Sequence, residues 1–180
     1  MSRLTIPTYE SSPSASQPLL QAVEGQLGVI PNLFRLVGNS PAALDGLLAL
    51  HGALGKTLDV KTRERIALTV AEVTGCDYCL SAHSYLAANL AGLDAAEIIA
   101  NRKGRSNDAR ADAAVIFARR VAQTRGKVDN ADLDAVQVAG FADGQIIEII
   151  ANVAINVFTN LINNVAQTDI DFPITHAGAF

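Results

Sequence analysis

Two cysteines and a histidine lie close together and form the clearest chemical pattern in the sequence. They are Cys76, Cys79 and His83, and they follow Gly75. If this segment is helical, an advance of about 100° per residue places all three side chains within an arc of about 60°. A thiol beside a second thiol and an imidazole suits redox or nucleophilic chemistry at sulfur, because the imidazole can take up or return the thiol proton.

Two further features bear on this cluster. Cys76 lies at the expected helix start, where unpaired N–H groups and the positive end of the dipole favour a thiolate, so this argument makes Cys76 the more reactive thiol. Glu64 lies twelve residues before Cys76, on a preceding helix. Its carboxylate could orient His83 and balance its charge, or it could belong to the solvated charged run Lys61–Arg65.

Two other interpretations of the cluster stay open. A Cys-x-x-Cys pair with a histidine supplies three ligands for zinc, but a closed structural site needs a fourth. The other histidines, His51 and His176, have neither ligand spacing nor a nearby partner in the sequence. The cysteines and His83 could also be ordinary core residues with a satisfied imidazole.

The composition indicates one folded domain. The chain has 180 residues, 49% of them hydrophobic and 18% charged, which excludes disorder as the dominant state. Two cysteines three positions apart also exclude a disulfide scaffold, because a bridge across so short a loop barely constrains the unfolded chain.

Charge and hydropathy argue against nucleic-acid and membrane partners. The chain has 14 Lys+Arg, 18 Asp+Glu and no basic cluster longer than Arg119-Arg120. The polar stretch Thr5–Pro18 lacks the apolar run of a secretory signal, so we expect a cytoplasmic protein. The segment Ile149–Thr168 has no charged residue, but it contains five asparagines, so it predicts the buried helix of a soluble protein.

The periodicity predicts an all-α fold, an orthogonal helical bundle in a single domain over residues 1–180. We expect residues 1–15 to form a mobile N-terminal arm and residues 169–180 an extended tail. The expected helices span 18–28, 32–37, 41–55, 60–74, 76–91, 94–101, 108–125, 131–138 and 143–167. Caps are expected at Ser40, Asp59, Asp94, Asn130 and Asp143.

The asparagines Asn152, Asn156, Asn160 and Asn164 recur every four residues along the last predicted helix. Buried amides need hydrogen-bond partners. These amides could bond across a subunit interface, or they could satisfy backbone groups within one chain. Neither alternative makes them catalytic.

The spacing of Glu64, Cys76, Cys79 and His83 resembles the signature of the alkylhydroperoxidase D (AhpD) branch of the carboxymuconolactone decarboxylase family. The similarity runs from Ser40 to about Gly92 and more loosely into the final helix. The resemblance implies an AhpD-like helical fold that assembles into trimers or hexamers. It also implies peroxide reduction through a sulfenic acid and then a disulfide within the motif.

The resemblance assigns the reactive cysteine differently from the argument based on the helix start. Cys79 would be the peroxidatic cysteine, Cys76 would protonate the leaving group and resolve the sulfenic acid, and Glu64 and His83 would relay the proton. We follow this order. Family members often have a histidine before the second cysteine, whereas Tyr78 stands there and can form hydrogen bonds but cannot shuttle protons at pH 7.

The expected function is therefore thiol-dependent reduction of a small-molecule alkyl hydroperoxide or peroxide, in antioxidant defence. The Gly140–Gly144 stretch lacks a preceding strand, so we expect no bound cofactor and an external dithiol or protein electron donor. The alternative is a dithiol redox or sensor protein of the same fold without peroxidase activity.

Overall fold

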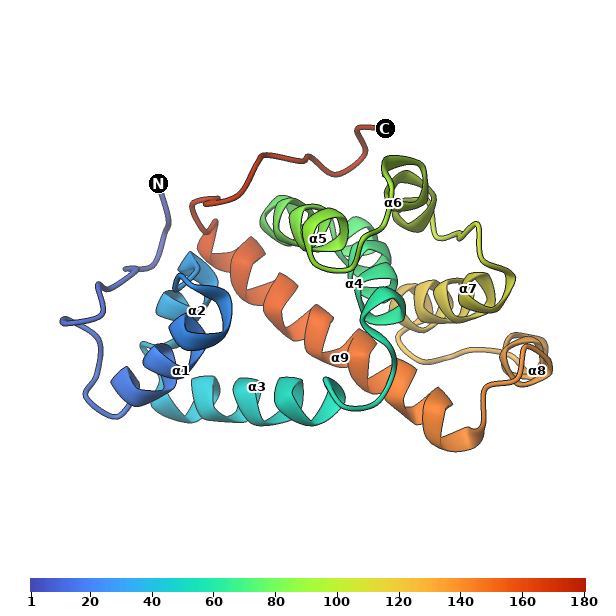
Figure 1. Cartoon of the computed structure of the whole chain (residues 1–180), viewed down its shortest axis with the longest axis horizontal. Coiled ribbons are helices and arrows are strands. Elements are labelled where there is room, and N and C mark those ends of the chain that lie inside the picture. The colour runs from blue at the N-terminus through green and yellow to red at the C-terminus, as the bar shows by residue number, and fades with distance from the viewer.

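The protein is a bundle of nine α-helices without a strand, as the sequence predicts (Figure 1). The computed structural model describes all 180 residues. The helices in chain order are α1 (Gln17–Leu27), α2 (Asn32–Val37), α3 (Pro41–Leu54), α4 (Val60–Thr74), α5 (Asp77–Asn89), α6 (Ala95–Arg102), α7 (Ala109–Thr124), α8 (Asn130–Val138) and α9 (Asp143–Ala166).

Helix α4 lies at the centre of the bundle and packs against α5, α6, α7 and α9. Its segment Ile66–Ala71 is buried on every side, as expected for a helix with almost no polar face. Helices α1, α2 and α3 lie at one end of the molecule, and α7 and α8 lie at the other (Figure 1). The helix that presents Glu64 is therefore held from several directions.

Most of the predicted caps are confirmed. Ser40, Asp59 and Asp94 each accept a hydrogen bond from the backbone N–H three residues later. These contacts satisfy N–H groups that have no partner within the helix, and they set where α3, α4 and α6 begin.

Two caps differ from the prediction by one residue. Helix α8 is capped by Asp129 and not by Asn130, because Asp129 and Asp132 form a reciprocal capping box. Helix α9 has Ala142 at its N-cap position and Asp143 as its first residue. The side chain of Gln145 accepts from the Ala142 N–H at 3.2 Å, so this amide is satisfied without a capping side chain at the start.

Helix α9 is long and apolar enough to cross a membrane by length and composition alone. It packs against α3, α4, α5 and α7, and Ile149 and Val153 belong to the core shared with α4. It is therefore a core helix of the bundle. Its outer face is apolar as well, and it exposes Ile147, Leu161 and Val165.

A buried carboxylate joins α4 to α6 and to the loop that precedes α7. Glu97 accepts from Arg65 at 2.7 Å, from the Ser106 hydroxyl at 2.5 Å and from the Asn107 N–H at 2.8 Å. Burial by itself would raise the pKa of Glu97, but these hydrogen bonds outweigh it and lower the pKa from 4.5 to about 2.

This contact should make the stability of the fold depend on pH in acid. Because the folded pKa lies below the unfolded one, the stabilisation is present above pH 4.5 and is lost as pH falls towards 2. Urea titrations should show the free energy of unfolding falling by about 2 kcal/mol between pH 6 and pH 3. Glu97→Gln should remove this part of the dependence, whereas Glu24→Gln, on an exposed position of α1, should retain it. Equal slopes in all three proteins would contradict the assignment.

Candidate active site

The turn between α4 and α5 positions the two cysteines. Gly75 ends α4 in the left-handed conformation (φ +65°), which glycine adopts without steric cost. Cys76 then takes an extended conformation and is the N-cap of α5, one residue before the helix, whereas the prediction made it the first residue of the helix. Its sulfur occupies the place of a capping oxygen and accepts the Cys79 backbone N–H at 3.2 Å.

The two sulfurs differ in acidity. The Cys79 thiol and the backbone N–H groups at the helix start donate to Cys76 and lower its pKa, although burial opposes this. Burial raises the pKa of Cys79, and its hydrogen bond to Cys76 adds to the rise. The argument from the helix start is thus supported for the resting pair, in which Cys76 is the better thiolate. Both side chains are buried, with Cys76 0% and Cys79 2% exposed.

Glu64 and His83 form a direct pair across α4 and α5. His83 Nδ1 lies 2.8 Å from Glu64 Oε2, and both side chains are partly buried. A carboxylate accepts only, so Nδ1 donates and Nε2 is left to exchange a proton. Glu64 therefore does not belong to the solvated charged run, and the structure brings it together with the residue that we expected it to orient.

An asparagine from α9 completes the surroundings of Cys79. Asn163 donates from Nδ2 to Cys79 Sγ at 3.3 Å, and this hydrogen bond lowers the pKa of the thiol, against the effect of burial. Asn163 was not among the residues predicted for the site. The one indication in the sequence is that Asn163 is a polar residue on the buried side of an apolar helix. Such a residue needs a hydrogen-bond partner, but the sequence does not identify that partner.

The other asparagines of α9 satisfy groups within the same chain. Asn160 and Asn164 donate to the side chain and the carbonyl of Thr74, just before the cysteine turn. Asn152 and Asn156 bond carbonyls of their own helix. The second of the two alternatives for this stripe is therefore the one that the structure supports, and the stripe fastens α9 to the end of α4.

Tyr78 contacts α2 and the C-terminal residues. Its hydroxyl accepts the Leu33 N–H at the start of α2 at 3.0 Å, and its ring meets Phe172 edge to face at 5.9 Å. Burial raises its pKa. Tyr78 thus anchors α5 to α2 and the tail, in keeping with the expectation that it forms hydrogen bonds.

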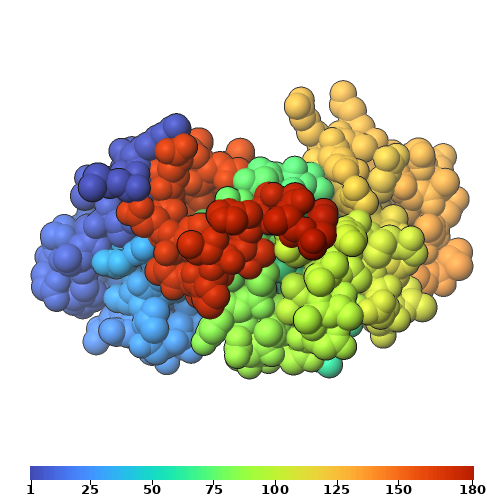
Figure 2. Space-filling view, turned by 90° about the horizontal axis from the view of Figure 1, so that it is seen from above, coloured from blue at the N-terminus to red at the C-terminus, as the bar shows by residue number.

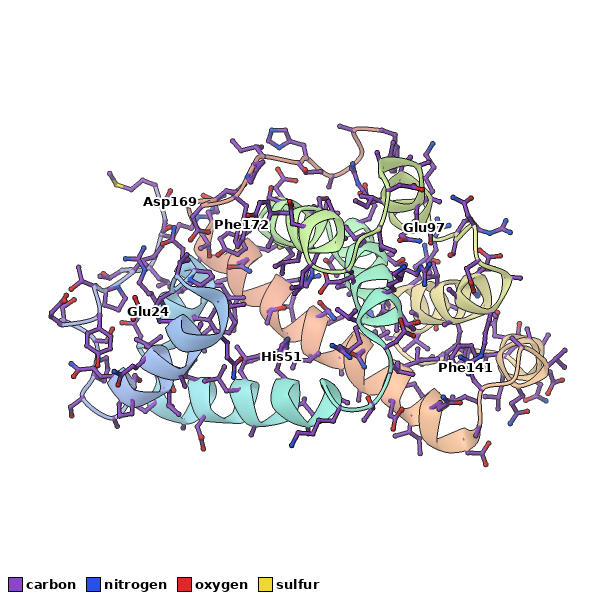
Figure 3. All side chains as sticks on the ribbon, viewed as in Figure 1. Glu24, His51, Glu97, Phe141, Asp169 and Phe172 are labelled. Atoms are coloured by element: carbon purple, nitrogen blue, oxygen red, sulfur yellow. The ribbon has the colours of Figure 1, made fainter.

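The C-terminal residues, which contain no helix, cross the start of α5 (Figures 1 and 2). Asp77 accepts from the Ala177 N–H at 2.9 Å and pairs with His176 at 2.7 Å. Phe172 lies beside α5, near the C-terminal end of α9 (Figure 3). His176 therefore does have a partner near the cysteines, which its position in the sequence did not predict. The structure holds no group of three or more His, Cys, Asp or Glu side chains arranged to bind a metal ion.

Comparison with known proteins agrees with this arrangement. Residues 41–124, which include the whole cluster, match the Carboxymuconolactone decarboxylase family. This segment belongs to that family. A curated relative, an uncharacterized protein of Haemophilus influenzae, is 50% identical over 46 residues, which is 24% of this chain and 41% of that protein. The chain thus matches less than half of the length of this relative.

Solved structures extend the similarity to the whole AhpD-like fold. An AhpD-core, peroxidase-related protein of Ralstonia eutropha JMP134 superposes with a TM-score of 0.83 at 23% identity, over 94% of this chain and 92% of the other. A peroxidase-related protein of Silicibacter sp. TM1040 gives 0.80 at 23% identity, over 93% and 91%. The debrominase Bmp8, as a complex with 2,3,4-tribromopyrrole, gives 0.79 at 22% identity, over 93% and 91%. The predicted fold is confirmed, residues 41–124 support the predicted family, and the proteins of similar fold include peroxidase-related proteins and a debrominase.

Proposed function

We propose that the protein is a thiol-dependent peroxidase that reduces a hydroperoxide with electrons from an external dithiol. The observation that carries this proposal is the 2.8 Å contact between Glu64 on α4 and His83, which lies on α5 one turn beyond Cys79. A thiol needs a proton acceptor to become a nucleophile, and a carboxylate keeps an imidazole oriented and stabilises its charged form.

The first chemical step oxidises Cys79. In the resting pair, Cys79 donates its hydrogen to the Cys76 thiolate, and transfer of this proton makes Cys79 the nucleophile and Cys76 the acid. The Cys79 thiolate attacks the terminal oxygen of the hydroperoxide and the O–O bond breaks. The alkoxide leaves as an alcohol with the Cys76 proton, and Cys79 becomes a sulfenic acid.

The second step forms a disulfide. The Cys76 thiolate attacks the sulfenic sulfur, the S–O bond breaks, and hydroxide leaves as water with a proton that His83 took up when the pair ionised. Glu64 stabilises the imidazolium between these events. An external dithiol then reduces the disulfide, and the hydroperoxide has been converted to alcohol and water.

A second candidate is a dithiol redox or sensor protein without peroxidase turnover. The burial of both sulfurs favours it, because access by a peroxide is limited in the resting state. A peroxide-consumption assay with a panel of dithiol donors separates the two. Turnover supports the peroxidase, and a single oxidation without turnover supports the sensor.

Mild peroxide should convert Cys76 and Cys79 into an intramolecular disulfide. The two residues lie within one turn, and the cytoplasm, where we place the protein, would otherwise keep both as thiols. Alkylation before and after oxidation, followed by mass analysis, should detect two free thiols in the reduced protein and none in the oxidised protein. Two remaining thiols, or dimers linked between chains, would contradict the redox proposal.

We also propose that the protein is a homo-oligomer, a trimer or a hexamer. The apolar residues exposed on α9 support this proposal, since burial between subunits would remove them from water. Light scattering should give a mass of three or six times 18.9 kDa. A monomer at micromolar concentration would contradict it.

A further inference from the structure

A cavity of about 340 Å³ lies beside the cysteine turn and has no role in the chemistry described so far. It is bounded by the start of α5, the end of α9 and the first residues of the tail. Of its eight lining residues only two are hydrophobic, Tyr78 and Ile170. Asp77 is the one charged side chain in the lining, so the cavity is polar and carries no positive charge.

Two of the lining residues each carry a buried side-chain oxygen atom that lacks a hydrogen-bond partner. These atoms are Oδ1 of Asn163 and Oγ1 of Thr168, from side chains that are 2% and 6% exposed. A buried polar atom without a partner destabilises a fold by about 1–3 kcal/mol, so its presence needs a reason.

The backbone holds these two residues together. Gln167 adopts a left-handed conformation at the end of α9 (φ +48°), and the chain turns back so that the Thr168 N–H donates to the Asn163 carbonyl at 3.2 Å. The same Asn163 amide donates to Cys79 Sγ through its nitrogen. One side chain therefore contacts the sulfur and keeps an acceptor free.

We infer that this cavity is the substrate subsite, and that Asn163 and Thr168 recognise the –OOH group of a small, neutral, polar hydroperoxide. The inference rests on the proposed function. The hydroperoxyl O–H donates to Asn163 Oδ1, which brings the terminal oxygen beside Cys79, and the Thr168 hydroxyl donates to a peroxide oxygen. The lining offers no cation to pair with an anionic peroxide, and its polar character disfavours long alkyl chains.

Thr168→Val is the decisive variant, because the two side chains have nearly the same shape. If the hydroxyl has no ligand, removing an unpartnered buried polar group should leave peroxide turnover unchanged and raise the urea midpoint. If the hydroxyl holds substrate, the midpoint should still not fall, but kcat/KM for hydrogen peroxide and tert-butyl hydroperoxide should drop about three- to tenfold, mainly through KM.

Three controls make the result specific. Thr168→Ser keeps the hydroxyl and should retain most of the activity. Thr124→Val removes a hydroxyl on α7, outside the cavity, and should leave turnover unchanged. Alkylation by iodoacetamide needs no hydroperoxyl recognition, so its rate should be the same in Thr168→Val and the parent protein. The parent should also prefer the two neutral peroxides to linoleic acid hydroperoxide, which carries a carboxylate and a long chain.

The outcomes distinguish this inference from the proposed function. If the parent protein consumes no peroxide with any dithiol, the proposed function is wrong and the inference falls with it. If the parent is active but Thr168→Val turns over peroxides equally well, the peroxidase stands and the subsite is wrong. Equal slowing of iodoacetamide and peroxide would also overturn the subsite, because it would indicate a change in access to the sulfurs.

Discussion

A Cys79→Ser protein should consume no peroxide above the uncatalysed rate, a loss of at least about a thousandfold. Serine keeps the size of the side chain but ionises far too weakly to attack an O–O bond at neutral pH. Cys79 receives a hydrogen bond from the Asn163 amide, which stabilises its ionised form, and Cys76 becomes the acid once it has taken the Cys79 proton. Loss of activity should therefore come without loss of the fold, which circular dichroism and the urea midpoint would check.

Cys76→Ser is the matched control for this experiment. The variant retains the nucleophile but lacks the resolving thiol, so a sulfenic acid should accumulate at Cys79 and be trapped by a dimedone-type reagent. The parent should give a disulfide and little adduct. Adduct in Cys79→Ser and none in Cys76→Ser would make Cys76 the nucleophile, as the argument from the helix start suggests. Adduct in neither would count against peroxidatic chemistry.

Glu64→Gln should lower the rate of peroxide reduction about 10- to 100-fold. The amide has the same shape as the carboxylate, but it lacks the negative charge that stabilises a protonated His83. The bond is short and partly buried, so solvent does not fully screen this charge. Stopped-flow measurement of the first oxidation would separate this effect from the later reduction by the dithiol.

His83→Asn and the double variant Glu64→Gln/His83→Asn test whether Glu64 and His83 act as one unit. Substitutions within one proton relay do not have additive effects on the activation free energy, so the double variant should be about as slow as His83→Asn alone. Asp45→Asn, on an exposed position of α3, should behave like the parent. If the losses in the two single variants multiply in the double variant, Glu64 and His83 act independently and the relay is wrong.

The sequence determined the local parts of this molecule. The bounds of α2 and α4 match the prediction, because proline, the Asp59 cap and Gly75 act on the backbone within a turn of where they stand. The buried character of α4 followed from an apolar pattern on all its sides. The spacing of Cys79 and His83 puts them on one side of α5 for the same reason, since a helix converts short sequence distance into one face.

Only the tertiary structure decided which distant groups reach the sulfurs. Asn163 lies 84 positions from Cys79, and His176 lies 99 positions from Asp77. No periodic pattern encodes such contacts, because they depend on how whole helices and the tail pack. The caps of α8 and α9 were predicted one residue too late for a related reason. Two neighbouring residues could each serve as the N-cap, and the one chosen is the one whose backbone N–H donates to the side chain of Asp132 or Gln145.

The acidity of the two thiols shows the same division. The sequence places Cys76 at a helix start, and this alone predicts a stabilised thiolate there. Burial of Cys79 among core side chains such as Leu68 and Leu80 determines how far the two pKa values move apart. Desolvation depends on every group packed around an atom, so only the folded structure determines it. The helix dipole and the free N–H groups follow from where the helix begins, which the local sequence predicts.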